Sequence, residues 1–252
     1  MTDAAPQSAA VVVQALAELA DPERAASSQG FFKTAPGQYG AGDLFIGITV
    51  PAQRRVARLF PALPVTELDA LLDSEVHEHR LTGLIIAGNG LERASRPAAR
   101  EEERRAAIAD WYLAAVRRGR VNNWDLVDAS AGVILGGWLF DRPRDVLFEL
   151  AASPDLWERR VAIIATQGFI NRGDASTTLD LAPLLLGDTE DLMHKAVGWM
   201  LREVGKRVDR ELLIGFLDEY AGRMPRTALS YATEHLSPEL RAQYRAVPRE
   251  LR

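Results

Sequence analysis

Apolar residues recur three and four positions apart along most of the chain, the spacing that gathers them on one face of an α-helix. Two such triplets are Val56, Leu59 and Phe60, and Leu68, Leu71 and Leu72. Capping side chains followed by proline mark expected helix starts at Asp21-Pro22, Ser153-Pro154 and Ser237-Pro238. Glycines mark expected helix ends at Gly119, Gly173, Gly187 and Gly222. The pattern predicts that most of the chain is helical.

Residues 31–50 break this helical pattern. A proline and four glycines interrupt the segment, at Pro36, Gly37, Gly40, Gly42 and Gly47. We therefore expect a loop, with several aromatic residues distributed through it. Its glycines do not fit a dinucleotide-binding fingerprint, and no phosphate-loop lysine with a following serine or threonine accompanies them. The sequence indicates no nucleotide or other organic cofactor.

A degenerate repeat runs through the rest of the chain. Five segments each have a charged residue leading a small or apolar helical stretch, and they start at Arg80, Asp125, Arg160, Lys195 and Arg226. The starts are 45, 35, 35 and 31 residues apart, and a further helical stretch precedes each one. This spacing is typical of HEAT-like helix pairs stacked into a solenoid. We expect an all-α, HEAT-like helical repeat solenoid with a concave binding surface, and a plain helical bundle is the alternative.

Composition limits the possible classes of protein. The chain has 252 residues, of which 47% are hydrophobic, enough for a sizeable core. We expect a single domain over residues 7–252 after a disordered tail over residues 1–6. The formal charge of -5 does not indicate a nucleic-acid-binding protein, so local clusters must support that interpretation. The absence of cysteine excludes disulfides, cysteine zinc sites and a thiol nucleophile.

Two further features concern location. The first residues lack the basic leader of a signal peptide, and no apolar stretch approaches the ~20 residues that span a bilayer. We therefore expect a cytoplasmic protein without membrane insertion, and a monomer by default.

Four residues form the most informative pattern in the chain, namely Trp124, Asp128, Arg160 and Trp199. Trp124 and Asp128 are four positions apart, so they share one face of a helix. Arg160 follows Trp124 by 36 residues and Trp199 follows Arg160 by 39, close to the period of stacked helix pairs. If the helices stack, two aromatic rings, a carboxylate and a guanidinium lie on a shared surface.

Each of these residues also has an ordinary structural interpretation. A tryptophan such as Trp124 is more often a core residue than a functional one. Asp125, next to Asn122 and Asn123, could be the aspartate that caps locally, and the sequence alone does not decide which aspartate matters. Arg159 and Arg160 point about 100 degrees apart on a helix, so only one can join the Trp124 face. The repeat register favours Arg160, whereas a solvated pair of ion-paired arginines is the alternative.

Cations surround Trp199. Lys195 lies one turn before it and Arg202 three residues after it. Lys206 and Arg226 follow near expected helix ends, where side chains and free amides could hold phosphates. Ordinary mixed surface charge is the alternative, because acidic residues accompany these cations.

The sequence gives little support for a metal site or for a catalytic nucleophile. His77 and His79 are two positions apart, so on a helix they face different ways and make a poor metal pair. We expect no metal site. No Ser-His-Asp spacing indicates a hydrolase triad.

Taken together, these segments resemble the AlkD-like DNA alkylation repair proteins, which are HEAT-like-repeat DNA glycosylases. The resemblance extends from about Phe31 to Tyr244. It rests on five segments: Phe31-Phe-Lys-Thr, Phe45-Ile-Gly-Ile-Thr-Val-Pro51, Trp124-Asp-Leu-Val-Asp128, Arg159-Arg160 with Ala162-Ile-Ile, and His194-Lys-Ala-Val-Gly-Trp-Met-Leu-Arg-Glu203.

The resemblance implies roles for individual residues. Asp128, Trp124 and Trp199 would be catalytic in a cleft that binds DNA. The resemblance also places Arg160, or Arg159 if the register slips, in this cleft. With the cations near Trp199 and Phe31, the expected DNA-binding residues are Arg160, Arg159, Lys195, Arg202, Lys206, Arg226 and Phe31. Some members carry a second aromatic residue before the motif tryptophan, where this chain has Asn123, and this difference concerns the range of lesions recognised.

The resemblance also implies an activity. A monofunctional glycosylase of this kind hydrolyses the N-glycosidic bond of cationic N3- or N7-alkylated purines in double-stranded DNA and leaves an abasic site. Asp128 would stabilise the developing sugar cation, and the base would not enter a tight pocket. The alternative function is a non-catalytic HEAT-like scaffold that binds DNA or a protein partner.

Overall fold

The computed structural model describes residues 7–249, so the tail expected over residues 1–6 lies outside the described residues. Within 7–249 the regular secondary structure is helical, and the only strand-like feature is an isolated bridge between Leu44 and Val76. The prediction of an all-α protein is confirmed. The chain divides into two compact units, 1–134 and 135–252, with the boundary inside one helix, α7. The expectation of a single domain stays a prediction.

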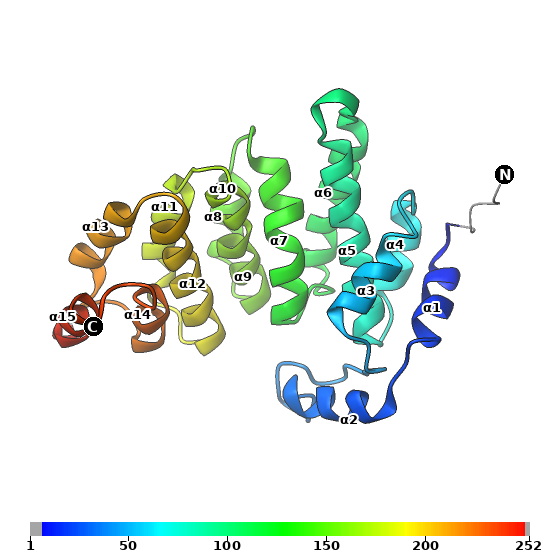
Figure 1. Ribbon diagram of the computed structural model, residues 1–252, viewed down its shortest axis with the longest axis horizontal. Coiled ribbons are helices and arrows are strands. Elements are labelled where there is room, and N and C mark those ends of the chain that lie inside the picture. The colour runs from blue at the N-terminus through cyan, green and yellow to red at the C-terminus, as the bar shows by residue number, and fades with distance from the viewer. Residues whose placement is uncertain (1–6, 250–252) are drawn as a thin grey trace. The chain divides into compact units, whose positions relative to one another are not determined.

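The first unit contains α1 to α6 and the start of α7 (Figure 1). Its helices are α1 (Ala9–Ala17), α2 (Pro22–Phe31), α3 (Val50–Ala57), α4 (Val65–Leu72), α5 (His77–Ala94), the short 3-10 helix η1 (Pro97–Ala99), α6 (Glu102–Arg117) and α7 (Trp124–Leu139). The long helix α5 packs against α3, α4 and α6 and forms the centre of this unit. Most of its positions are buried, and Leu81, Leu84, Ile86 and Leu91 are among those that contribute to the apolar core.

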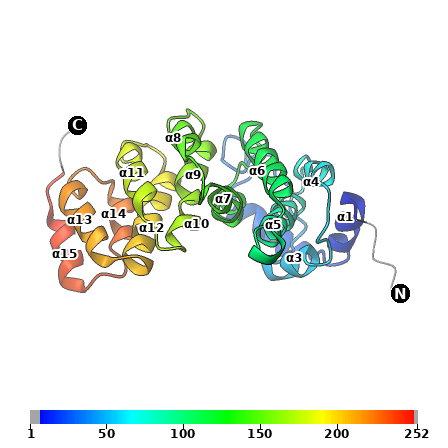
Figure 2. The same ribbon diagram turned by 90° about the horizontal axis from the view of Figure 1, so that it is seen from above.

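In the second unit, the described residues up to 249 form the rest of α7 and eight further helices. They are α8 (Asp145–Ala151), α9 (Leu156–Ala165), α10 (Gln167–Ile170), α11 (Ser176–Leu185), α12 (Asp191–Arg207), α13 (Arg210–Tyr220), α14 (Arg226–Ala232) and α15 (Pro238–Ala246). Figure 2 shows α8 beside α9 and α11 beside α12, and both pairs are in contact. Helix α12 also packs against α9, α13 and α14 and is the centre of the second unit.

The repeat predicted from the sequence matches these helix pairs. Its five segments fall on α5, α7, α9, α12 and α14, each of which follows a partner helix in the chain. Three of these five helices pack on the helix that precedes them in the chain, namely α5 on α4, α9 on α8 and α12 on α11. Helix α14 packs on α12, the corresponding helix of the preceding repeat. The stacked-pair architecture expected from the sequence is confirmed within each unit.

The two apolar triplets that the sequence placed on helix faces in the first unit are buried, except at one residue. Leu68, Leu71 and Leu72 are buried on α4, as are Val56 and Phe60 near the end of α3. Leu59 is wrong as a predicted core residue, because its side chain is 64% exposed. The reason is that α3 ends at Ala57, so the helical periodicity no longer applies at Leu59.

Two of the three predicted proline-linked helix starts are confirmed. The Asp21 carboxylate accepts from the Arg24 amide at 3.1 Å, and the Ser237 hydroxyl accepts from the Leu240 amide at 3.4 Å. The start predicted at Ser153-Pro154 is wrong, since α9 begins at Leu156. The Asp155 carboxylate caps it by accepting from two backbone amides, and a charged acceptor satisfies them better than a hydroxyl.

The predicted helix ends agree with the structure. Gly119, Gly173, Gly187 and Gly222 all lie just after a helix. Gly119 and Gly173 have φ values of 68° and 83°, in the left-handed region that side chains with a Cβ atom avoid. None of the helices within 7–249 is long and apolar enough to cross a bilayer.

Gly198→Ala should destabilise the second unit. An added Cβ would lie 2.6 Å from Tyr231 Cβ and closer still to the Ala228 carbonyl oxygen, because α12 and α14 touch at this point. Overpacking costs about 1–3 kcal/mol, more than the ~1 kcal/mol that alanine gains in helix propensity. Gly215→Ala on α13 is the matched control, since nothing lies within 4 Å of its added Cβ. Urea unfolding should show a loss for the first variant and no loss for the second, and equal stabilities would contradict this packing.

Candidate functional site

An aromatic cluster, formed by Phe31, Phe32, Phe45, His77 and Trp124, surrounds the start of α7. The Phe32 ring stacks on Trp124, with centroids 5.4 Å apart, and on Phe45, with centroids 4.9 Å apart. Phe45 stacks in turn on the His77 ring at 4.7 Å. Phe31 meets the Trp124 indole edge-on at 6.0 Å and is 66% exposed. The loop predicted over 31–50, observed between α2 and α3, thus holds Trp124 in place.

An ionic network lies beneath the cluster and consists of Asp43, His77, Arg80 and Asp125. His77 Nδ1 lies 2.9 Å from Asp43 Oδ2, and His77 Nε2 lies 2.8 Å from Asp125 Oδ2. Arg80 pairs with Asp43 at 2.5 Å. Because both ring nitrogens of His77 face carboxylates, both donate, and the imidazole is held in its charged form.

The pKa values agree with this geometry. Burial alone would lower the pKa of His77, but hydrogen bonds to Asp125 and Asp43 outweigh it and raise this pKa to about 9. Burial alone would raise the pKa of Asp43. The hydrogen bond to His77 and the Arg80 charge outweigh burial, so the pKa of Asp43 lies below its usual value. His77 and Asp43 are therefore both ionised at neutral pH.

The network fixes the first turn of α7. Asp125, the second residue of the helix, is bound to His77 and also accepts from the Leu126 amide at 2.9 Å. The side-chain Oδ1 of Asn123 accepts from the Trp124 backbone amide at 2.9 Å, and the side-chain Nδ2 of Asn123 donates to Asp43 at 3.2 Å. Asp125 thus has a structural role. The sequence alone had not decided which of Asp125 and Asp128 has this role.

Asp128 lies one turn further along α7 and is half-buried. It is close to Tyr112 of α6, whose hydroxyl is 2.8 Å from the Ser130 hydroxyl. Burial first, and then the Asp128 charge, raise the pKa of Tyr112. Trp124 and Asp128 therefore occupy one face of a helix whose start is rigidly held.

The stability of the first unit should fall at alkaline pH. His77 has a folded-state pKa of about 9 against an ordinary value of 6.5, so its stabilising contribution is complete below pH 6.5. The contribution is lost as pH rises through 9, and the shift corresponds to about 3 kcal/mol. Urea unfolding at pH 6.5, 8 and 10 should show a falling free energy for the wild type and a smaller fall for His77→Gln. Parallel curves for the two proteins would contradict the assignment to His77.

The second unit carries the other predicted site residues. Trp199 is half-buried on α12, and Arg160 on α9 is buried and donates to the Leu192 carbonyl at the start of α12. Arg159 Nε donates to Asp188 at 2.6 Å, and Arg159 also donates to the Ser153 and Pro154 carbonyls. Arg159 therefore links the segment before α9 to the segment before α12 through hydrogen bonds.

The remaining predicted DNA-binding cations are mostly paired. Lys195 lies 2.7 Å from Asp191, and Arg202 pairs with Glu203 and Glu234. Arg226 donates to the carbonyls of Arg245 and Val247, whereas Lys206 is exposed in the last turn of α12. A lysine or arginine that already has a partner can still donate to phosphate through its remaining N–H groups. These DNA-binding assignments stay predictions.

The four-residue pattern is divided between the two units. Trp124 and Asp128 belong to the first unit, and Arg160 and Trp199 belong to the second. A surface shared by all four stays a prediction. Within 7–249, no group of three His, Asp or Glu side chains is arranged to hold a metal ion.

Sequence reasoning missed part of the site. It considered His77 only as a metal ligand, and it did not connect Phe32, Asp43 or Arg80 with Trp124. The aromatic residues between 31 and 45 offered a signal, because they lie in a loop that would otherwise be polar. The ionic network offered none, since Asp43 and Asn123 are 80 residues apart.

The family described as "DNA alkylation repair enzyme" matches residues 12–236, and the chain belongs to this family. A solved structure described as "Predicted DNA alkylation repair enzyme from Enterococcus faecalis" is similar, with 18% sequence identity and a TM-score of 0.66. The match covers 87% of this chain and 97% of that one, and at this identity it shows the fold. No curated protein matches the chain.

Proposed function

We propose that this protein is a monofunctional DNA glycosylase for purines alkylated at N3 or N7, and that it leaves an abasic site in double-stranded DNA. Membership of the DNA alkylation repair enzyme family supports a role in alkylation repair. The observation that carries the finer assignment is the pair Trp124 and Asp128, one turn apart on α7. The aromatic cluster and the ionic network hold the start of this helix, and such preorganisation is what transition-state stabilisation requires.

The chemistry suits a single carboxylate. Alkylation at N3 or N7 makes the purine cationic, so it leaves as a neutral base when its bond to C1′ breaks. The sugar becomes an oxocarbenium ion, water adds at C1′, and the water loses a proton. A carboxylate about 4 Å from that cation, at an effective dielectric constant near 20, contributes on the order of 4 kcal/mol, or about a thousandfold in rate. This route requires no cofactor.

Contacts to the DNA add binding energy. Trp124 and Trp199 would each contribute about 0.5–2 kcal/mol against a cationic nucleotide. Phe32 stacks on one face of the Trp124 indole, so a nucleotide would meet the opposite face or the edge near exposed Phe31. Arg160, Arg159, Lys195, Arg202, Lys206 and Arg226 would position backbone phosphates. The base need not enter a tight pocket, and the protein would act as a monomer.

Duplexes that carry one defined lesion test this function. Purified protein should release 7-methylguanine, which is cationic, and should not release neutral O6-methylguanine. Spontaneous depurination of each duplex is the control. Equal release of both bases would contradict the reliance on a cationic leaving group. Binding without release of either base would favour the scaffold that the sequence left as the alternative.

A further inference from the structure

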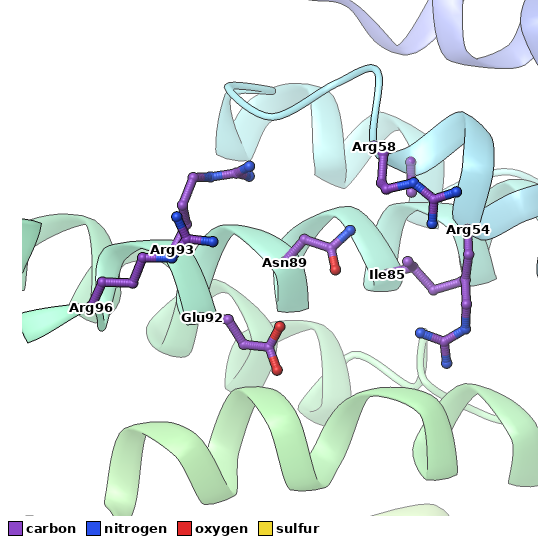
Figure 3. Close-up of a pocket in the computed structure, with 8 residues that line it drawn as sticks. Arg54, Arg58, Ile85, Asn89, Glu92, Arg93 and Arg96 are labelled. Carbon is purple, nitrogen blue, oxygen red and sulfur yellow. The ribbon is translucent and has the colours of Figure 1, made fainter.

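A pocket lined with arginines lies between α3 and α5, away from the aromatic cluster. Its volume is about 370 Å³, and its polar lining consists of Arg54, Arg58, Asn89, Glu92, Arg93 and Arg96. Figure 3 shows Arg54 and Arg58 on one side, Arg93 and Arg96 on the other, and Asn89 between them. The α5 residues that line the pocket, from Ile85 to Arg93, lie 8 to 16 residues after His77, which is about 12–24 Å along a helix axis. The pocket is therefore separate from the site around Trp124.

The positive charges in this pocket are only partly neutralised by the protein. Within residues 7–249, Arg54, Arg58 and Arg96 form no side-chain hydrogen bond and no ion pair. Many arginines elsewhere are paired, as Arg159 is with Asp188 and Arg202 is with Glu234. The pocket therefore presents guanidinium groups whose donors are available to a ligand.

Arg93 shows how crowded the positive charge is. Its guanidinium donates to the Pro61 carbonyl at 2.9 Å, so it is fixed in place. Burial, followed by the nearby Arg104 and Arg96 charges, lowers the pKa of Arg93, and Glu101 opposes this only in part. A bound anion would relieve the repulsion.

Stabilisation of helix ends does not account for these arginines. Cations often lie near helix C-termini, and α3 and α5 both end beside the pocket. Each helix end carries a charge of about -0.5, so the two offset only about one positive charge. Four arginines against Glu92 give an excess of three positive charges, and an excess of about two remains.

The lining indicates which anion fits. Arginine donors match phosphate oxygens, and Asn89 adds an amide donor. The apolar lining is Ala57 and Ile85, so no aromatic ring is present to stack a nucleobase. Recognition would thus reach a phosphate and its sugar but not the base, as in contacts that position a DNA backbone.

We propose that the pocket between α3 and α5 is a phosphate-binding site that holds a backbone phosphate of duplex DNA at a distance from Trp124. This inference rests on the proposed function for the identity of DNA as the ligand. It assigns part of the DNA affinity to residues outside the pattern that the sequence indicated.

The test uses the full chain and unmodified duplex DNA. Arg54→Ala/Arg96→Ala removes two exposed arginines, one from α3 and one from the segment just after α5. Fluorescence anisotropy should show about tenfold weaker binding, and the slope of log K against log salt should fall by about 0.9, the change expected for one lost phosphate contact. Arg55→Ala/Arg210→Ala removes two exposed arginines that do not line the pocket and should weaken binding less than threefold. Arg54→Lys/Arg96→Lys should retain most of the affinity.

A second measurement identifies the source of the phosphate. Inorganic pyrophosphate is added to the wild type and to the alanine variant, and thermal unfolding is followed. Unchanged DNA binding with loss of a pyrophosphate-induced stabilisation would overturn the DNA assignment and indicate a free phosphorylated ligand. No difference in either measurement would overturn the site. The binding test uses DNA without a lesion, so its result does not depend on catalysis. Failure to release base from a duplex with a lesion would therefore contradict the glycosylase proposal and leave the phosphate site standing.

Discussion

Asp128→Asn should slow base release from 7-methylguanine duplexes by about a thousandfold. Asparagine keeps the size of the side chain and its ability to accept a hydrogen bond, but it lacks the charge that would stabilise the sugar cation. Loss of about 4 kcal/mol of transition-state stabilisation gives this factor. Single-turnover kinetics at saturating protein should measure it, with the affinity for the same duplex remaining within about threefold of wild type.

Asp125→Asn is the informative companion variant. Asp125 binds His77 and caps the first turn of α7, so its substitution should lower the free energy of unfolding. Base release by the folded fraction should remain within about tenfold of wild type. A rate for Asp128→Asn within threefold of wild type would remove Asp128 from the mechanism, and a larger loss for Asp125→Asn would exchange the two roles.

His77→Gln should destabilise the first unit by about 3–5 kcal/mol. The substitution removes the cation between Asp43 and Asp125, whose side chains are only 10% and 14% exposed. Removing one partner of a buried ionic group leaves uncompensated charge, which accounts for the size of the loss. Urea unfolding followed by tryptophan fluorescence should report it, because Trp124 stacks in the adjoining cluster.

His79→Gln is the matched control for that variant. His79 lies two residues along the same helix, and its Nδ1 is 2.9 Å from the Ser74 hydroxyl, a single neutral hydrogen bond. Its loss should cost about 1 kcal/mol. Equal effects of the two substitutions would contradict the view that His77 acts as a buried cation.

Helical periodicity and repeat spacing carried the prediction of the fold. The repeat starts, such as Arg80 and Lys195, fall on the second helix of each pair because a stacked architecture needs the same register in each repeat. Errors occurred where a helix ended earlier or began later than expected. Leu59 lies beyond the end of α3, and the Asp155 carboxylate replaced the predicted cap at Ser153.

The candidate site was predicted only in part. Trp124 and Asp128 could be paired because both lie within one turn of one helix. The contacts that hold them could not be predicted, since His77 meets residues 34 and 48 positions away in sequence. Such pairings depend on how the loop before α3 folds over α5, which no local pattern encodes. The arginine pocket was missed for a similar reason, because Arg54 and Arg93 come from different helices.

The most direct test of the central claim is the release of free base from methylated duplex DNA by the wild-type protein, measured against spontaneous depurination. The proposed function predicts free 3-methyladenine or 7-methylguanine well above the spontaneous rate, with an equal number of abasic sites in the DNA. A folded protein that binds the same duplex and releases no base above the spontaneous rate would contradict it.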